Sequence, residues 1–88
     1  MAIDKHKINI MIEMARKAMK NAFVPVTNHG VGASVLTKSG HIFIGCNVQS
    51  HISGLGTCAE RSSIDNAVAH GEYDVMAICV VSKNRLYP

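Results

Sequence analysis

The feature that most constrains the fold is an uninterrupted apolar run at Val75–Val81, rich in β-branched residues. The run is far shorter than the roughly 20 residues needed to cross a bilayer, so it predicts a strand rather than a membrane span. A continuous apolar strand, unlike one that alternates apolar and polar residues, is typical of a sheet covered on both faces. The chain must then supply helices around a sheet, which indicates the α/β class.

The segments before this strand fit that class. Between Asp4 and Ala22, apolar residues recur at three- and four-residue spacing, which predicts a helix with Asp4 as its N-cap and Pro25 beyond its end. The apolar positions of this helix are Ile8, Met11, Ile12, Ala15, Met19 and Ala22. Residues 31–36 and 41–44 are then two short strands, and the turn at 38–40 between them predicts an antiparallel hairpin.

A second helix is expected after the hairpin, with Thr57 as its N-cap and Gly71 at its end. A strand, a helix and the Val75–Val81 strand in this order imply a right-handed crossover, with the second and third strands parallel. No internal repeat or linker divides the 88 residues, so one domain is expected.

Composition excludes several classes of function. The net charge of +3 comes from scattered residues, and there is no Trp, which argues against a nucleic-acid partner. The N-terminus lacks the apolar segment of a secretory signal, so we expect a cytoplasmic protein without membrane attachment. Three cysteines, at positions 46, 58 and 79, do not form a disulfide framework.

The candidate catalytic and metal-binding residues lie at 57–61, where a loop leads into the second helix. A helix N-terminus favours a thiolate at Cys58, the form that binds zinc, and Glu60 in the first turn could act as a general acid/base. Arg61 could offset the negative charge of thiolates on a metal. Two plainer interpretations stay open: Thr57-x-x-Glu60 also matches a capping box, and a single Cys is often a small buried residue. Cys46 and Cys79 are assigned to packing.

Four segments, 21–25, 31–36, 45–49 and 58–61, resemble the zinc-dependent cytidine deaminase family in order and spacing across nearly the whole chain. The resemblance implies a three-layer α/β/α cytidine-deaminase-like sandwich with a mixed sheet, made of a helix, a β-hairpin, a crossover helix and a parallel strand. It also implies a role for each matched residue. Cys58 is the first of three thiolate ligands of a catalytic Zn²⁺, Glu60 the proton shuttle, Arg61 a hydrogen-bond donor to the cysteine ligands, Asn47 a contact to the ribose, and Ala59 a backbone contact to the base.

The sequence departs from the family pattern at several positions. Gln49 replaces a Glu that binds ribose, which keeps an acceptor but loses its charge, and His29 stands where the family often has an aromatic residue beside the base. The loop at 50–56 looks closer to that of blasticidin-S deaminases, so a modified cytosine nucleoside is also a candidate substrate. The chain stops at Leu86-Tyr87-Pro88, where the family continues with Pro-Cys-x-x-Cys. Residues 1–88 are therefore expected to be the N-terminal portion of a deaminase domain.

Three functions follow from these observations. The leading one is zinc-dependent hydrolytic deamination of cytidine or deoxycytidine in pyrimidine salvage, by a homodimer or homotetramer like the relatives. The alternative is a non-catalytic deaminase-like fold that serves as an interaction or assembly module, since a single thiolate does not hold a catalytic zinc. A redox thiol protein that uses Cys58 is a weaker third hypothesis, because no C-x-x-C motif is present.

Overall fold

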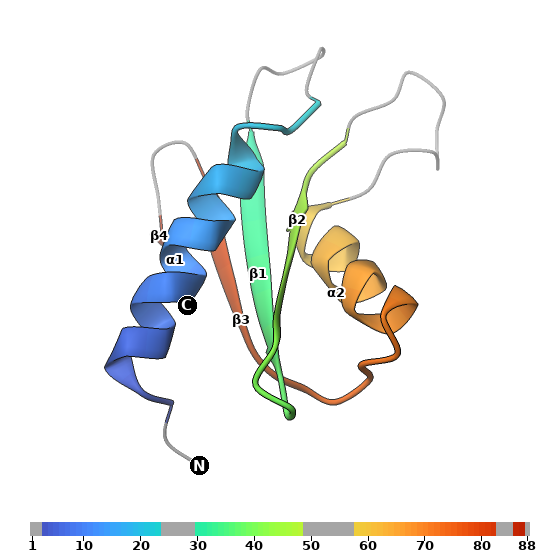
Figure 1. Ribbon diagram of the computed structural model, residues 1–88. Coiled ribbons are helices and arrows are strands. Elements are labelled where there is room, and N and C mark those ends of the chain that lie inside the picture. The colour runs from blue at the N-terminus through green and yellow to red at the C-terminus, as the bar shows by residue number, and fades with distance from the viewer. Residues whose placement is uncertain (1–2, 24–29, 49–57, 83–85, 88) are drawn as a thin grey trace.

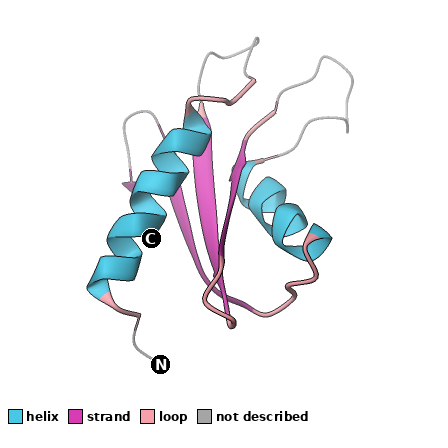
Figure 2. Ribbon diagram, viewed as in Figure 1, coloured by secondary structure: helices cyan, strands magenta, loops and turns pink. Residues whose placement is uncertain are grey.

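The computed structural model describes residues 3–23, 30–48, 58–82 and 86–87, and these form a small α/β domain (Figures 1 and 2). The elements in chain order are α1 (Lys5–Met19), β1 (Val31–Thr37), β2 (Ile42–Cys46), α2 (Ala59–Ala69), β3 (Val75–Ser82) and β4 (Leu86–Tyr87). Among these residues, no helix is long and apolar enough to span a bilayer.

The strands form one sheet in the order β2-β1-β3-β4, and each neighbouring pair is antiparallel. β2 and β3 both run antiparallel to β1 and therefore point the same way, as the crossover predicts, but β1 lies between them. The expectation of a mixed sheet needs refinement. Within the described part of the chain, parallel pairing is limited to an isolated bridge between Phe23 and Val48.

The two helices cover opposite faces of the sheet, which confirms the three-layer arrangement (Figure 1). A Cβ atom at Gly32 would lie 1.9 Å from the carbonyl oxygen of Ala15, so this face of β1 contacts α1. A Cβ atom at Gly45 would lie 2.3 Å from the amide nitrogen of Ser63 in α2. Gly45 pairs with Ala33, the neighbour of Gly32, and successive strand residues face opposite sides.

The core on the α1 side is a compact apolar cluster whose buried members are Met11, Ala15, Leu36, Cys79 and Val81. Ser34 lies on the same face of β1 and is buried, and its hydroxyl donates a hydrogen bond to the Met11 carbonyl at 2.8 Å. On the other face, the fully buried Ala33 and Val35 lie beneath the buried Ala59, Ser63 and Ala67 of α2. Small residues on both sides of this second interface let the helix approach the sheet closely.

β3 departs from the prediction that it is buried on both faces. Cys79 and Val81 are buried under α1, but Ile78 and Val80 on the opposite face are only half-buried, and Val75 is exposed. The physical reason is the placement of α2, which packs mainly against β1 and β2 and only lightly against β3. The apolar run correctly indicates a strand, but the described residues cover only one of its faces fully.

The helix ends show which local signals the sequence carries. Asp4 caps α1 as predicted, accepting a hydrogen bond from the amide of His6 at 3.2 Å, and the chain leaves α2 through Gly71 with a φ of 82°. α1 ends at Met19, three residues before the predicted Ala22. The expectation of Thr57 as N-cap of α2 is wrong, because that position belongs to Cys58.

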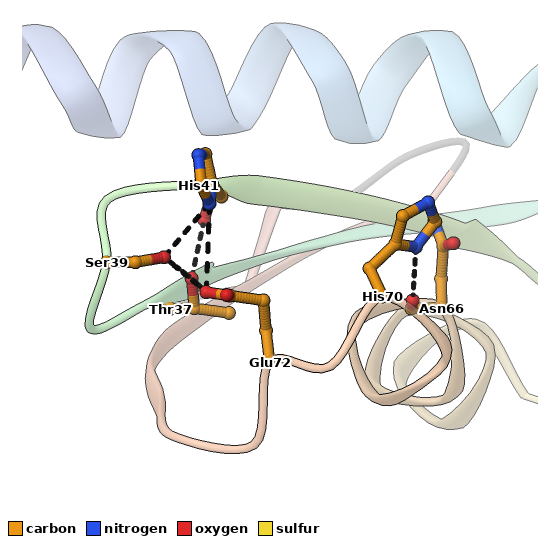
Figure 3. Close-up of polar contacts among 6 residues, drawn as sticks. All are labelled: Thr37, Ser39, His41, Asn66, His70 and Glu72. Atoms are coloured by element: carbon orange, nitrogen blue, oxygen red, sulfur yellow. Dashed lines mark hydrogen bonds and ion pairs between the residues drawn. The ribbon is translucent and has the colours of Figure 1, made fainter.

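A polar network ties the C-terminal end of α2 to the β1–β2 turn (Figure 3). Cys58 lies at the other end of the helix. The Glu72 carboxylate accepts hydrogen bonds from Thr37 Oγ1 at 2.8 Å and from the Ser39 hydroxyl, and it lies 3.7 Å from Nδ1 of His41. These hydrogen bonds, led by that from Ser39, lower the pKa of Glu72 below its usual value of 4.5. The network fixes the loop between α2 and β3 on the hairpin.

Candidate active site

The N-terminus of α2 lies beside the end of β2 (Figure 1). Four of the predicted site residues, at positions 58–61, belong to this helix start, and Asn47 directly follows β2. The close approach depends on Gly45, because a Cβ atom there would also lie 2.8 Å from the Ala59 carbonyl oxygen. A second contact comes from Asn66, whose side-chain Nδ2 donates to the carbonyl of Ile44 at 3.1 Å. Since β2 is an edge strand, this bond also satisfies a carbonyl that has no strand partner on that side.

Cys58 occupies the N-cap of α2 with extended backbone angles, φ −83° and ψ 160°, and its side chain is solvent-accessible. Its thiol makes no capping hydrogen bond, so the helix N-terminus keeps its positive partial charge next to the sulfur. Residues 46, 58 and 79 are all thiols in this structure, not disulfides.

Glu60 and Arg61 follow in the first turn of α2, and both are exposed. Glu60 is the second helical residue rather than the third, because Cys58 is the N-cap, so the Thr57-x-x-Glu60 capping box does not describe this helix start. A carboxylate in the first turn is stabilised by the helix dipole, and its exposure leaves it open to water and to a ligand. Ala59 between Cys58 and Glu60 is buried against the sheet.

Asn47 lies just past the end of β2 and is half-buried. Its Oδ1 atom accepts a hydrogen bond from the amide of Val31 at 2.8 Å, and its own amide donates to the Val31 carbonyl at 3.1 Å. The bond to Oδ1 therefore holds the side chain against β1. Asn47 directly follows β2, and the end of this strand lies beside the start of α2, to which Cys58 and Glu60 belong (Figure 1).

Phe23 is a site neighbour to which the sequence assigns no role. Its amide donates to the carbonyl of Asn47 at 3.1 Å, which brings the residue after α1 against the end of β2. Phe23 is 59% exposed although it is a large aromatic residue. The signal in the sequence is only its place in the 21–25 segment, and no spacing rule points to residue 47.

Two predicted binding residues, His29 and Gln49, lie outside the described residues. Cys79 is buried in the core as predicted, and burial raises the pKa of its thiol. Cys46 is half-buried at the end of β2.

The described residues fit a zinc site only in part. Cys58 has the right chemistry and placement for a thiolate ligand, but within ranges 3–23, 30–48, 58–82 and 86–87 no three His, Cys, Asp or Glu side chains come together to hold a metal. Catalytic zinc sites take three protein ligands and an open position. The part of the chain that the structure describes thus contains one candidate ligand, Cys58, and no complete set.

Comparisons with known proteins place this geometry in context. Residues 5–86 match the family model of the cytidine and deoxycytidylate deaminase zinc-binding region. A cytidine deaminase of Halalkalibacterium halodurans is 37% identical over 76 residues, covering 86% of this chain and 58% of that protein. A blasticidin-S deaminase of Bacillus cereus is 36% identical over 53 residues, covering 60% of this chain and 38% of that protein.

Solved structures agree with the sequence matches. The crystal structure of a cytidine deaminase from Mycobacterium tuberculosis aligns with 99% of this chain and 69% of its own, with a TM-score of 0.87 and 27% identity. The chain spans between 53% and 58% of the length of the first curated relatives that it matches.

Proposed function

Because this chain belongs to the cytidine and deoxycytidylate deaminase family, we propose that the protein hydrolyses the exocyclic amino group of a cytosine nucleoside, cytidine or deoxycytidine, to the uracil product and ammonia. The observation that carries the proposal is the pairing of an exposed thiol at the N-cap of α2 with an exposed carboxylate two residues later. The family match supplies the reaction class, and this pairing supplies groups suited to it.

Glu60 is proposed to move the protons of the reaction. A water oxygen forms a bond to C4 of the cytosine ring, and the proton that the water loses passes through the carboxylate to ring nitrogen N3. Glu60 then takes the second proton from the hydroxyl group now on C4 and delivers it to the amino group, the C4–N bond breaks and ammonia leaves, so that the oxygen on C4 becomes the uracil carbonyl. An exposed position in the first turn of α2 suits a carboxylate that exchanges protons with both water and substrate.

Cys58 is proposed as one ligand of Zn²⁺, a metal whose chemical contribution would be to lower the pKa of bound water. Since the described residues contain no set of three ligands, the remaining donors must come from outside them. Arg61, adjacent in sequence to the carboxylate, is proposed to balance thiolate charge there.

Substrate binding is proposed to involve the residues at the end of β2. Asn47 contacts the sugar and the Ala59 backbone contacts the base, while the exposed ring of Phe23 offers a flat apolar surface for the base to stack on. His29 and Gln49 stay predicted binding residues. Gln49 is uncharged, so a weaker hold on a ribose hydroxyl is expected than a Glu would give.

Self-association into a homodimer or homotetramer, a cytoplasmic location and a place in pyrimidine salvage belong to the same proposal. A non-catalytic assembly module is the second candidate, and the half-buried apolar side chains of β3 favour it, because they form a surface that another polypeptide could cover.

The test is a deamination assay on the complete gene product, which follows the absorbance change of cytidine, deoxycytidine and blasticidin S, with adenosine as the negative control. Bound zinc is measured in parallel for the wild type and for Cys58→Ser. The proposal expects turnover of at least one cytosine nucleoside and loss of both zinc and activity in Cys58→Ser. Stoichiometric zinc without turnover would point to another substrate, and absence of zinc from the wild type would favour the assembly module.

A further inference from the structure

Asn47 uses its side chain where a strand residue ordinarily uses its main chain. Gly32 pairs with Cys46, so the next position along β2, Asn47, comes opposite Val31. The amide of Asn47 donates to the Val31 carbonyl at 3.1 Å, as the antiparallel ladder requires. The return bond differs: the Val31 amide donates to the side-chain Oδ1 of Asn47 at 2.8 Å.

The main-chain carbonyl of Asn47 is used on the other side of the strand. It accepts the amide of Phe23 at 3.1 Å, next to the parallel bridge between Phe23 and Val48. In a hydrogen-bonded antiparallel pair, the amide and the carbonyl of a residue point to the same neighbour. The backbone of Asn47 has therefore turned between these two groups, and without the side chain this turn would deprive the Val31 amide of its partner.

We infer that Asn47 is a positioning residue whose amide oxygen replaces its own carbonyl in the β1–β2 ladder, so that this carbonyl can hold Phe23 beside the candidate active site. The hydrogen-bond arrangement stands without the proposed function, and only the description of the neighbourhood as an active site rests on it.

The position of Phe23 depends strongly on this bond. The side chain of Phe23 is 59% exposed, so packing contributes little to its placement. The main-chain bond to Asn47 instead joins the turn that follows α1 to the end of β2. A residue that only contacts the substrate would matter once the ligand is bound, whereas the role inferred for Asn47 is needed in the ligand-free protein.

Two substitutions separate the acceptor role of the side chain from its donor role. Asn47→Asp keeps an oxygen that accepts the Val31 amide but lacks the NH₂ donor, and Asn47→Ala lacks both. Asn9→Asp is the matched control, because Asn9 is an exposed residue in the middle of α1 and the change adds the same charge.

The experiment is amide hydrogen exchange of the complete chain, read residue by residue by NMR. Asn47→Ala is expected to speed exchange of the Val31 and Phe23 amides by about tenfold or more, the factor that corresponds to losing one hydrogen bond. Asn47→Asp and Asn9→Asp are expected to keep the protection of both amides within about threefold of the wild type. If Asn47→Ala does not fold, a folded Asn47→Asp that keeps this protection is the supporting result.

Wild-type protection of both amides in a folded Asn47→Ala would overturn the inference, as would exchange in Asn47→Asp as fast as in Asn47→Ala. Kinetics give an independent readout. Asn47→Asp is expected to raise KM with little change in kcat, because Phe23 stays in place, and Asn47→Ala to lower kcat/KM further. A wild type without turnover contradicts the proposed function instead, and hydrogen exchange then decides the role of Asn47 alone.

Discussion

Glu72 shows at the scale of one residue how local hydrogen bonds alter chemistry far from the candidate site. Ser39 and Thr37 both donate to its carboxylate, and His41 lies within ion-pair distance (Figure 3). Each of these contacts favours the charged form, and together they lower the pKa of Glu72 in the folded protein. A lowered pKa in the folded state makes stability depend on pH.

The first prediction concerns Glu72→Gln. A carboxyl whose pKa falls on folding adds stability that is fully present above its unfolded pKa, near 4.5, and is lost as the pH drops through the lower folded pKa. The wild type should therefore have a higher urea midpoint than Glu72→Gln at neutral pH. The difference should shrink as the pH falls below about 4.5 and through the lower folded pKa of Glu72. Urea unfolding of both proteins between about pH 3 and pH 7 measures this. A difference that stays constant over the whole range would contradict it.

The residue types of the candidate site could be predicted, but not all of their contacts. Cys58 and Glu60 are identified because the sequence locates a helix start, and a helix start has a known charge. The double use of Asn47 could not be predicted, because it depends on a backbone turn after β2 that no short motif encodes. The contact of Phe23 could not be predicted either, because its partner, Asn47, is 24 positions away in the sequence.

At the scale of elements, the placement of α2 on β2 determines where Cys58 and Glu60 lie. Two residues hold this contact, Gly45 through the absence of a side chain and Asn66 through its bond to the Ile44 carbonyl. Ala59 and Ser63 form the helix side of the interface, and both are buried. A shift of α2 would move the first turn relative to Asn47 and Phe23.

The second prediction is that Gly45→Ala destabilises the fold and displaces α2. The new Cβ atom would meet the Ser63 amide nitrogen at 2.3 Å, and backbone cannot move aside as a flexible side chain can. Overpacking of this kind costs about 1–3 kcal/mol of unfolding free energy. Gly40→Ala is the control, because its Cβ atom would meet nothing within 4 Å and only the φ of 95° is strained, a cost of about 1 kcal/mol.

Urea unfolding and amide chemical shifts of α2 residues distinguish the two glycine variants. Gly45→Ala should lose more stability than Gly40→Ala and should shift the NMR signals of α2, whereas Gly40→Ala should change signals only around the hairpin turn. Equal losses with undisturbed α2 signals in both variants would show that the contact at Gly45 is not tight.

Element types and order follow from apolar periodicity and capping signals, and all five long elements are predicted. The burial of β3 could not be predicted. An apolar run shows that both faces of a strand can be buried, but it does not show where the covering helix lies. α2 lies over β1 and β2, so Ile78 and Val80 stay half-buried. The N-cap of α2 also differs from the prediction, by one residue. Thr has a far stronger capping preference than Cys, so the sequence favours Thr57, but the structure has Cys58 at this position.

At the scale of the whole molecule, apolar residues of α2 and β3 are left partly uncovered. Ile78 and Val80 pair with Val35 and Ala33, so they share the face of the sheet that α2 covers only in part. On α2, Asn66 marks the side toward β2, and Ile64 and Val68 lie on the opposite side of the helix. Ile64 is 38% exposed and Val68 46% exposed, so the four residues form a surface suited to contact with another polypeptide.

The third prediction is that this surface drives self-association. Ile64→Lys should weaken association measured by sedimentation velocity over a series of concentrations, because a charge would have to be buried in the contact. Ile8→Lys is the matched control, since Ile8 is 42% exposed on α1, away from this surface, and its substitution should leave association unchanged. Equal effects of both substitutions would contradict the prediction.

The proposed deamination depends most on Glu60, the group proposed to move protons. The most direct test is the kcat for cytidine of the complete gene product, compared with that of Glu60→Gln, with zinc content and urea midpoint measured on both. The prediction is a fall in kcat of about 10²–10⁴-fold, the usual contribution of a general acid/base, with zinc and stability retained. A Glu60→Gln variant that turns over cytidine as fast as the wild type would contradict the proposed role of Glu60 in proton transfer.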